Sequence, residues 1–245
     1  MNSDVNAVSP WPLRSAKAAA TRAGIIAAAG RLFTEHGYLG TSVQLIADAA
    51  GVSRATVFNS VGGKAALLRA AYDVATVGDD APVPLPQRPE ALAIRAEPDP
   101  RRAIRMYAAL VTGVSSRLAG IYEAFRSAAG VDPEVRAMWE QIQAERLAGA
   151  RRFVQIIGAK GPDLPGPLAD AAGDLIWVLI DASLYHRLVI ERGWSKRRFQ
   201  NWLASTMEAQ LLPSATRHDP PSPGPDAPGK ELPGVRQRKP HRPHD

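Results

Sequence analysis

The stretch from Thr41 to Lys64, TSVQLIADAAGVSRATVFNSVGGK, is the feature of this 245-residue sequence that most restricts its fold. Its centre is Gly51, which can adopt the left-handed backbone conformation of a tight turn at little steric cost. Ala47 stands four residues earlier, where a small side chain allows two helices to cross closely. The apolar residues that would point inward between these helices are Ile46, Val52 and Val57. This spacing predicts a helix-turn-helix.

Helical periodicity continues on both sides of this motif. A stripe of apolar residues at three- and four-residue spacing predicts a helix over residues 14–36, with Gly37 as its C-cap. Thr41 or Ser42 would cap a short helix to about residue 49. Ser53 would cap a second one over residues 54–59, which is the helix expected to enter a DNA major groove. Another helix is expected over residues 64–77.

The rest of the chain also predicts helices, without a strand of comparable length. Residues 78–100 are rich in Pro and acidic residues, which indicates a loop with one helical turn near residues 91–95. Asp132-Pro133 is a strong helix start, because Asp can cap the helix and Pro suits its first position. The expected helices of this part cover residues 100–118, 120–129, 133–158, 168–192 and 196–211, and Ser195 would cap the last of them.

The sequence therefore predicts an all-α fold with four regions. Residues 1–13 are expected to be a flexible arm, and residues 14–64 a three-helix DNA-binding domain that contains the helix-turn-helix. Residues 65–212 would form a larger helical body. Residues 213–245 are rich in Pro and basic residues with little apolar surface to bury, so a disordered tail is expected.

Composition excludes several other classes of protein. The sequence has no Cys, so it can form neither a disulfide nor a thiolate metal site. The longest apolar run, Leu175–Ile180, is far shorter than the roughly 18 residues of a membrane span. The N-terminus lacks the apolar core of a secretory signal. We therefore expect a cytoplasmic protein without membrane contact, metal or cofactor.

The positive charge is concentrated near the helix-turn-helix. Residues 1–72 carry seven Lys or Arg against three Asp or Glu, whereas residues 73–212 carry seventeen of each. A basic head on a neutral body is typical of a nucleic-acid-binding module attached to a domain with another task. A chance distribution of a few charges would give the same pattern.

The first three expected helices resemble the N-terminal domain of the TetR family of bacterial transcriptional regulators. The resemblance covers about residues 20–70 and rests on matches in order and spacing. The matching residues are Leu32-Phe33, Gly37-Tyr38, Thr41-Ser42-Val43, Ile46-Ala47, Ala50-Gly51-Val52-Ser53, Thr56-Val57-Phe58, Lys64 and Leu67-Leu68. The remainder matches the family only as a helical body of suitable length.

The resemblance implies roles for residues at the matching positions. Those expected to face base edges are Gln44, Arg54, Ala55, Thr56 and Asn59; Arg54 suits guanine and Asn59 suits adenine. Those expected at phosphates are Thr41, Ser42, Phe58, Ser60 and Lys64. Phe58 stands where many members carry Tyr, so it keeps the ring but lacks the hydroxyl donor. Gly62-Gly63 would either let the backbone approach phosphate or form a flexible turn.

The family resemblance also implies that the body forms a homodimer and holds a pocket for a small molecule. The residues expected in the dimer interface are Leu175, Leu179, Leu184, Trp202, Leu203 and Met207. The residues expected to line the pocket are Met106, Tyr107, Tyr122, Phe125, Met138, Trp139, Ile142, Trp177 and Asp181. Each of these side chains could instead belong to the core of a single chain.

The expected function is that of a dimeric repressor that binds a palindromic operator in double-stranded DNA. A small apolar or amphipathic ligand would release it. The alternative is an architectural or protein-responsive DNA-binding protein without a small-molecule effector. An enzyme is not expected, because the sequence lacks a Gly-rich phosphate loop, a nucleophile elbow and an evident pair of nucleophile and base.

Overall fold

The computed structural model describes residues 11–161 and 166–212, and these residues form helices and connecting turns without a strand. The first four helices are α1 (Trp11–Gly40), α2 (Val43–Ala50), α3 (Arg54–Ser60) and α4 (Lys64–Val77). The others are α5 (Pro89–Ala96), α6 (Pro100–Ala129), α7 (Pro133–Gly158), α8 (Gly166–Leu179), α9 (Ala182–Tyr185) and α10 (Lys196–Leu211). A 3-10 turn, Leu85–Gln87, precedes α5, and a π-helical segment, His186–Glu191, follows α9. The predicted tail and residues 1–10 of the predicted arm lie outside the described residues.

Helix α1 confirms the predicted break at Gly37 but starts earlier than expected. Gly37 has a φ of 67° and a ψ of 178°, which interrupts the helical backbone although the helix continues to Gly40. The helix begins at Trp11, so the last three residues of the predicted arm are helical. The chain therefore turns at Gly37 before it enters the helix-turn-helix.

Helix α6 is one continuous helix of 30 residues, so the predicted break between residues 118 and 120 is wrong. Gly120 lies inside it, where a glycine usually weakens a helix. A Cβ atom at this position would overlap the side chain of Thr34 in α1. Gly120 is thus explained by the close approach of α1 and α6, which a sequence pattern along one helix cannot reveal.

The Gly120 contact predicts a loss of stability in Gly120→Ala. We expect the free energy of unfolding to fall by about 1–3 kcal/mol, because α1 and α6 must separate to admit the new methyl group. Urea unfolding followed by circular dichroism measures this change. The double variant with Thr34→Ala should recover most of the loss, since it removes the atoms nearest the new Cβ. A Gly120→Ala protein as stable as the wild type would contradict the packing argument.

The predicted long helix over residues 168–192 is also wrong, because it is divided at Asp181. Helix α8 ends at Leu179, and Asp181 is the N-cap of α9, where its carboxylate accepts a hydrogen bond from Ser183 N at 2.9 Å. The chain then continues through the π-helical segment to the left-handed Gly193 and to Ser195, the predicted N-cap of α10. Contacts of Asp181 with other helices explain this break and are described below.

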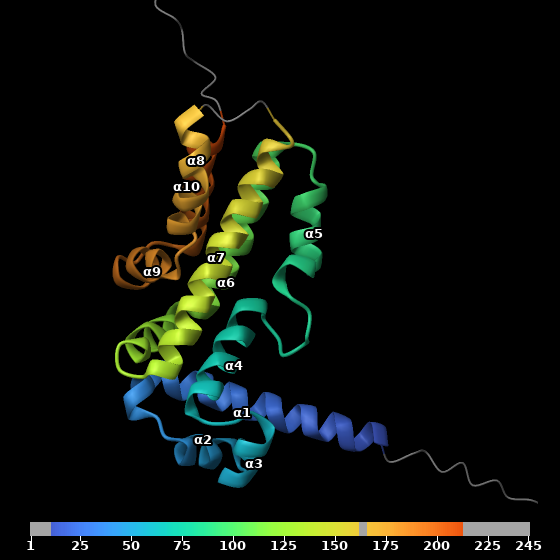
Figure 1. The fold of residues 1–245 in the computed structure, drawn as a ribbon, viewed down its shortest axis with the longest axis vertical. Helices are drawn as coiled ribbons and strands as arrows, with labels where there is room; N and C mark the ends of the chain where they lie inside the picture. Colours follow the sequence, from blue (N-terminus) through green and yellow to red (C-terminus); the bar gives the residue numbers. More distant parts are fainter. Residues whose placement is uncertain (1–10, 162–165, 213–245) are drawn as a thin grey trace, which may run out of the picture. The chain divides into compact units, whose positions relative to one another are not determined.

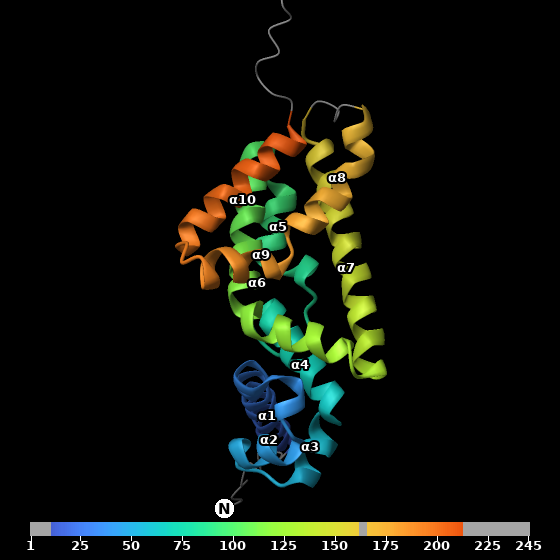
Figure 2. The ribbon, with the colours of Figure 1, turned by 90° about the vertical axis from the view of Figure 1, so that its left-hand side faces the viewer.

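Two clusters of buried side chains hold the helices together. The first joins α1–α4 to the C-terminal half of α6 and the N-terminal half of α7. The second joins the other halves of α6 and α7 to α5, α8 and α10. Helix α6 therefore contributes to both cores. Figures 1 and 2 show α2 and α3 at the opposite end of α6 from α8 and α10.

Helix α4 connects the helix-turn-helix to the body and is held at both ends. Leu67 and Leu68 near its start are fully buried in the first core. At its other end, Arg117 of α6 donates hydrogen bonds to the carbonyl oxygens of Ala75 and Thr76 at 2.8 and 2.9 Å. Arg117 thus links the end of α4 to α6. Among the described residues, no helix is long and apolar enough to cross a membrane.

Candidate functional site

The backbone of residues 42–60 has the geometry expected of a helix-turn-helix. Gly51 lies in the left-handed region with a φ of 67° and a ψ of 32°. This conformation lets the next residue, Val52, donate its N–H to Ala47 O at 3.0 Å. Ser42 and Ser53 cap α2 and α3, because each side-chain oxygen accepts a hydrogen bond from a backbone N–H three residues later.

The packing between α2 and α3 also agrees with the prediction. Ile46, Ala47 and Val57 have no exposed surface, and Val52 is half-buried against the same core. The side chains between these apolar positions therefore point away from the core. They form the surface that α2 and α3 present to solvent.

The side chains expected at base edges lie on this surface. Gln44, Arg54, Ala55 and Asn59 are exposed, and Thr56 is half-buried. The Gln44 amide nitrogen donates to Asp48 Oδ1 at 2.8 Å, and Thr56 Oγ1 lies 2.8 Å from Ser53 Oγ. Gln44 and Thr56 are thus held by local hydrogen bonds, whereas the described structure gives Asn59 no such bond.

Arg54 and Phe58 form a pair on the exposed side of α3. The guanidinium carbon of Arg54 is 5.5 Å from the centre of the Phe58 ring, a distance typical of a cation–π contact. Phe58 is 44% exposed, which is unusual for a Phe in a folded protein. The ring therefore restricts the guanidinium group and keeps it beside α3.

The residues expected at phosphates are in different environments, and Thr41 does not belong to this set. Thr41 is 1% exposed, and its hydroxyl donates to the carbonyl oxygens of Gly37 at 2.8 Å and Leu32 at 3.0 Å. It stabilises the end of α1 instead. Ser42 is exposed, and Ser60 and Lys64 are half-buried, so these three remain near the surface.

Lys64 lies over an aromatic ring that is linked to the body. Its ammonium nitrogen is 4.3 Å from the centre of the Tyr38 ring, and the Tyr38 hydroxyl donates to Asp132 Oδ2 at 2.7 Å. Burial lowers the pKa of Lys64, and the negative charge of Asp132 offsets part of this change. Asp132 is also the N-cap of α7. This cluster therefore connects the start of α4 to the corner between α6 and α7.

Arg22 has a role that the sequence pattern did not indicate. It could have been a phosphate contact, but its Nη1 donates to the carbonyl oxygen of Ser60, the last residue of α3, at 2.7 Å. Its Nε is 3.0 Å from Asp80 Oδ2. Arg22 therefore fixes the C-terminal end of α3 against α1. The two partners lie 38 and 58 residues away in the sequence, so no local sequence pattern predicts these contacts.

The turn before α4 contains a glycine with an unusual backbone. Gly62 has a φ of 120°, a region that side chains rarely adopt. Gly63 is the N-cap of α4 and provides no side-chain hydrogen bond to the first turn. The N–H groups at the start of α4 are therefore not capped by a side chain, as at many anion-binding helix ends.

A cavity of about 750 Å³ lies in the body between α4, α6, α7 and the segment 81–86. Three of the nine residues expected to line a pocket, Tyr107, Tyr122 and Ile142, line it. Asp181 lies next to it, because its carboxylate accepts a hydrogen bond from Tyr122 at 2.6 Å and pairs with Arg146, another lining residue, at 2.9 Å.

The other five residues expected in the pocket belong to the cores. Phe125 has no exposed surface, and Met138 and Trp139 pack in the same cluster. Met106 and Trp177 pack against the second cluster. Their helical spacing places them on buried faces, and only the relative rotation of α6, α7 and α8 decides which faces border the cavity.

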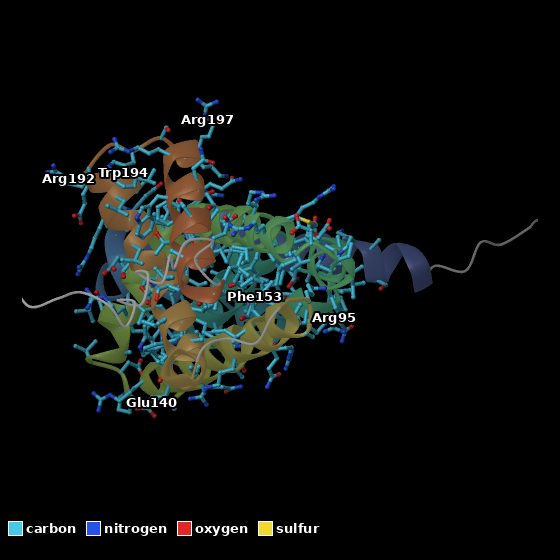
Figure 3. The ribbon with its side chains drawn as sticks, turned by 90° about the horizontal axis from the view of Figure 1, so that it is seen from above. Arg95, Glu140, Phe153, Arg192, Trp194 and Arg197 are labelled. Carbon is cyan, nitrogen blue, oxygen red and sulfur yellow. The ribbon has the colours of Figure 1, made fainter. Side chains whose placement is uncertain are left out.

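The residues expected in a dimer interface divide into two groups. Leu203 and Met207 of α10 have no exposed surface, so they serve the core of one chain instead. Leu175 of α8 is exposed, and Leu179, Leu184 and Trp202 are half-buried. Helices α8 and α10 pack side by side (Figure 1). Figure 3 shows Phe153 in the interior of the body and Trp194 and Arg197 at its periphery.

Solved structures with this fold come from several bacteria. A candidate transcriptional regulator from Pseudomonas aeruginosa PAO1 is similar over 85% of this chain and 95% of its own, with 20% identity and a TM-score of 0.58. A candidate fatty acid metabolism regulator from Clostridium perfringens is similar over 78% and 100%, with 13% identity and a TM-score of 0.55. A candidate TetR-family transcriptional regulator from Mesorhizobium loti MAFF303099 is similar over 80% and 96%, with 19% identity and a TM-score of 0.53.

These structures share the fold, and the DNA-binding segment is matched directly. No curated protein matches the sequence. Residues 25–71 match the family model of bacterial regulatory proteins, tetR family. This segment contains the last part of α1, the helix-turn-helix and the first half of α4, which are the elements described above. Residues 25–71 therefore form a DNA-binding segment of the kind found in bacterial regulatory proteins of the tetR family.

Proposed function

We propose that the protein is a dimeric repressor that leaves a palindromic operator when a small apolar or amphipathic molecule enters the body. The observation that carries this proposal is the position of the cavity. Tyr72 and Thr76 of α4 border it, and α4 begins at Lys64 beside the helix-turn-helix. A ligand that moves α4 would therefore act on the DNA-binding surface.

The contacts proposed for DNA follow from exposure. Arg54 and Asn59 would read base edges, with Gln44, Ala55 and Thr56 beside them. Ser42, Ser60 and Lys64 would hold phosphates together with the uncapped N-terminus of α4. Phe58 would pack against the sugar-phosphate backbone while it restrains Arg54.

The route from the cavity to DNA would use two links between head and body. Arg117 joins α6 to the end of α4, and the Tyr38–Asp132 hydrogen bond joins the end of α1 to the start of α7. A ligand shifts the equilibrium only when it binds the DNA-incompetent arrangement more tightly than the DNA-bound one.

Dimerisation would use the exposed apolar side chains of α8 with the half-buried ones of α10. Leu175 and Val178 are 37% and 52% exposed, and Trp202 is half-buried. Two copies that pair through this face would form a four-helix interface. Such a dimer would present two copies of α3 to the half-sites of a palindrome.

Selection from random duplexes with the full-length chain tests the proposal. We expect recovery of a palindromic sequence, a complex of two chains per duplex, and loss of this complex when a cavity ligand is added. Binding that does not exceed the non-specific level at moderate salt would refute the operator. An operator complex that no cavity ligand weakens would leave DNA binding intact and refute the ligand response.

A further inference from the structure

The charged side chains around the cavity are not equally available to a ligand. Two carboxylates line it, Asp73 of α4 and Glu145 of α7. Both are held by Arg69, whose Nε is 2.9 Å from Asp73 Oδ1 and whose Nη2 is 3.7 Å from Glu145 Oε2. A cationic ligand would have to compete with Arg69 for either carboxylate.

Two more arginines line the cavity from α7, and only one of them is neutralised. Arg146 pairs with Asp181 at 2.9 Å. Arg152 is exposed, and among the residues that the structure describes no carboxylate lies within ion-pair distance of it. The adjacent Arg151 differs, because it pairs with Asp174 and does not line the cavity. The positive charge without a partner is therefore at Arg152.

The helix leaves space between these two arginines. Gly149 lies midway between Arg146 and Arg152 on the cavity side of α7, and a Cβ atom built on it would meet no atom within 4 Å. At a rise of about 1.5 Å per residue, the two arginines are separated by roughly 9 Å along the helix. An anionic group of the size of a carboxylate can approach the backbone there.

A neutral hydrogen-bond donor also lines the cavity. Tyr107 of α6 lines the cavity and stacks on Phe153, the neighbour of Arg152, with ring centres 3.7 Å apart. Its hydroxyl makes no hydrogen bond to a described residue. Burial raises the pKa of Tyr107, and the positive charge of Arg146 offsets only part of this change, so the phenol stays protonated. A guanidinium and a phenol together suit a carboxylate.

Most of the remaining wall is apolar. Leu110, Val114 and Leu118 line the cavity from α6, and Pro82, Pro84 and Pro86 line it from the segment before α5. A chain of methylene groups would bury its apolar surface along these residues, which favours binding. The cavity wall thus combines a guanidinium group and a phenol with apolar side chains.

We propose that this cavity binds an amphiphile with a single anionic head, which Arg152 and Tyr107 hold beside Gly149, and an unbranched apolar tail along α6. This ligand class rests on the proposed function, in which occupation of the cavity controls DNA binding. Cationic amphiphiles should therefore not bind, and neutral amphiphiles of equal length should bind more weakly than the anionic one.

Calorimetric titration of the full chain with three ten-carbon probes tests this inference. The probes are decanoate, 1-decanol and decyltrimethylammonium, each below its critical micelle concentration. We expect decanoate to bind at least about tenfold more tightly than the other two, and Arg152→Gln to weaken it by about tenfold, as loss of a hydrogen bond to a charged group does. Arg151→Gln, on the same helix but outside the cavity, should bind decanoate like the wild type.

Several outcomes would overturn the inference. The inference would be refuted by absence of decanoate binding or by equal affinity for 1-decanol or for the cation. It would also be refuted by an undiminished affinity for decanoate in Arg152→Gln. Gly149→Val is a second variant, since its side chain would fill the space for the head and should abolish decanoate binding without loss of helix content. Operator release by 1-decanol alone would refute the ligand class and keep the ligand response. Decanoate binding without operator release would support the ligand class and refute the proposed ligand response of DNA binding.

Discussion

Replacing Asp181 with Ala is expected to lower the free energy of unfolding by about 3 kcal/mol. The Asp181 carboxylate accepts hydrogen bonds from Tyr122 of α6 and from Ser183 N of α9, and it pairs with Arg146 of α7 at 2.9 Å. The side chains of this ion pair are only 15% and 21% exposed. Removal of the carboxylate leaves Arg146 charged and largely buried without its partner. A buried charge without a partner strongly lowers the free energy of unfolding.

The same residue predicts a pH dependence. Burial by itself would raise the pKa of Asp181, but hydrogen bonds from Ser183 and Tyr122 and the charge of Arg146 together lower it. Because the pKa is lower in the folded protein, the stabilising contribution is present above the ordinary pKa of about 3.9 and is lost as the pH falls through the folded value. The difference in stability between the wild type and Asp181→Ala should therefore narrow below about pH 4.

Urea unfolding at neutral and acidic pH measures both effects. Asp174→Ala is the matched control, since Asp174 also pairs with an arginine of α7, but both side chains are more than 60% exposed. Exposed ion pairs contribute little to the free energy of unfolding, so Asp174→Ala should change it by less than about 1 kcal/mol. An Asp181→Ala protein no less stable than Asp174→Ala would show that the pair does not hold α9 against α6 and α7.

Arg54→Ala is expected to weaken operator binding by about 1–3 kcal/mol and to relax the preference at one base pair. Arg54 is exposed at the start of α3, and the Phe58 ring 5.5 Å away restricts its guanidinium. A restricted guanidinium loses less freedom when it forms a bidentate contact with guanine. The loss should therefore appear on the operator and be much smaller on random DNA.

Lys64→Ala is the control for this variant. A phosphate contact carries no base information, so its loss should weaken operator and random duplexes alike and reduce the salt dependence of binding. Fluorescence anisotropy with both duplexes at several salt concentrations separates the two patterns. An equal loss on operator and random DNA in Arg54→Ala would exclude a base-reading role for Arg54.

Capping residues account for most of the correctly predicted helix boundaries. Ser42, Ser53, Asp132 and Ser195 were each predicted as N-caps or as alternatives for one, and each accepts a hydrogen bond from a backbone N–H within its own first turn. Such a bond joins residues two or three positions apart. A single sequence contains everything needed to predict it.

The incorrect predictions share a different cause. A break was expected between residues 118 and 120, and the apolar run before Ile180 was expected to continue a helix. Close packing against Thr34 explains Gly120, and the contacts of Asp181 with Arg146 and Tyr122 explain the break after α8. These partners lie 35 to 86 residues away in the sequence. Leu203 and Met207 were misassigned for a related reason, because an apolar helix face fits a core and a dimer interface equally well.

The sequence alone determined the helix-turn-helix, since the steric demands of Gly51, Ala47 and the two serine caps act within about ten residues. It also determined the side chains that α2 and α3 expose. Tertiary structure decided the rest: that Arg22 fixes the end of α3, that Tyr38 connects Lys64 to Asp132, and that Arg152 faces a cavity while Arg151 does not. These properties depend on the rotation of one helix against another, which is set by packing between distant residues and leaves no local pattern.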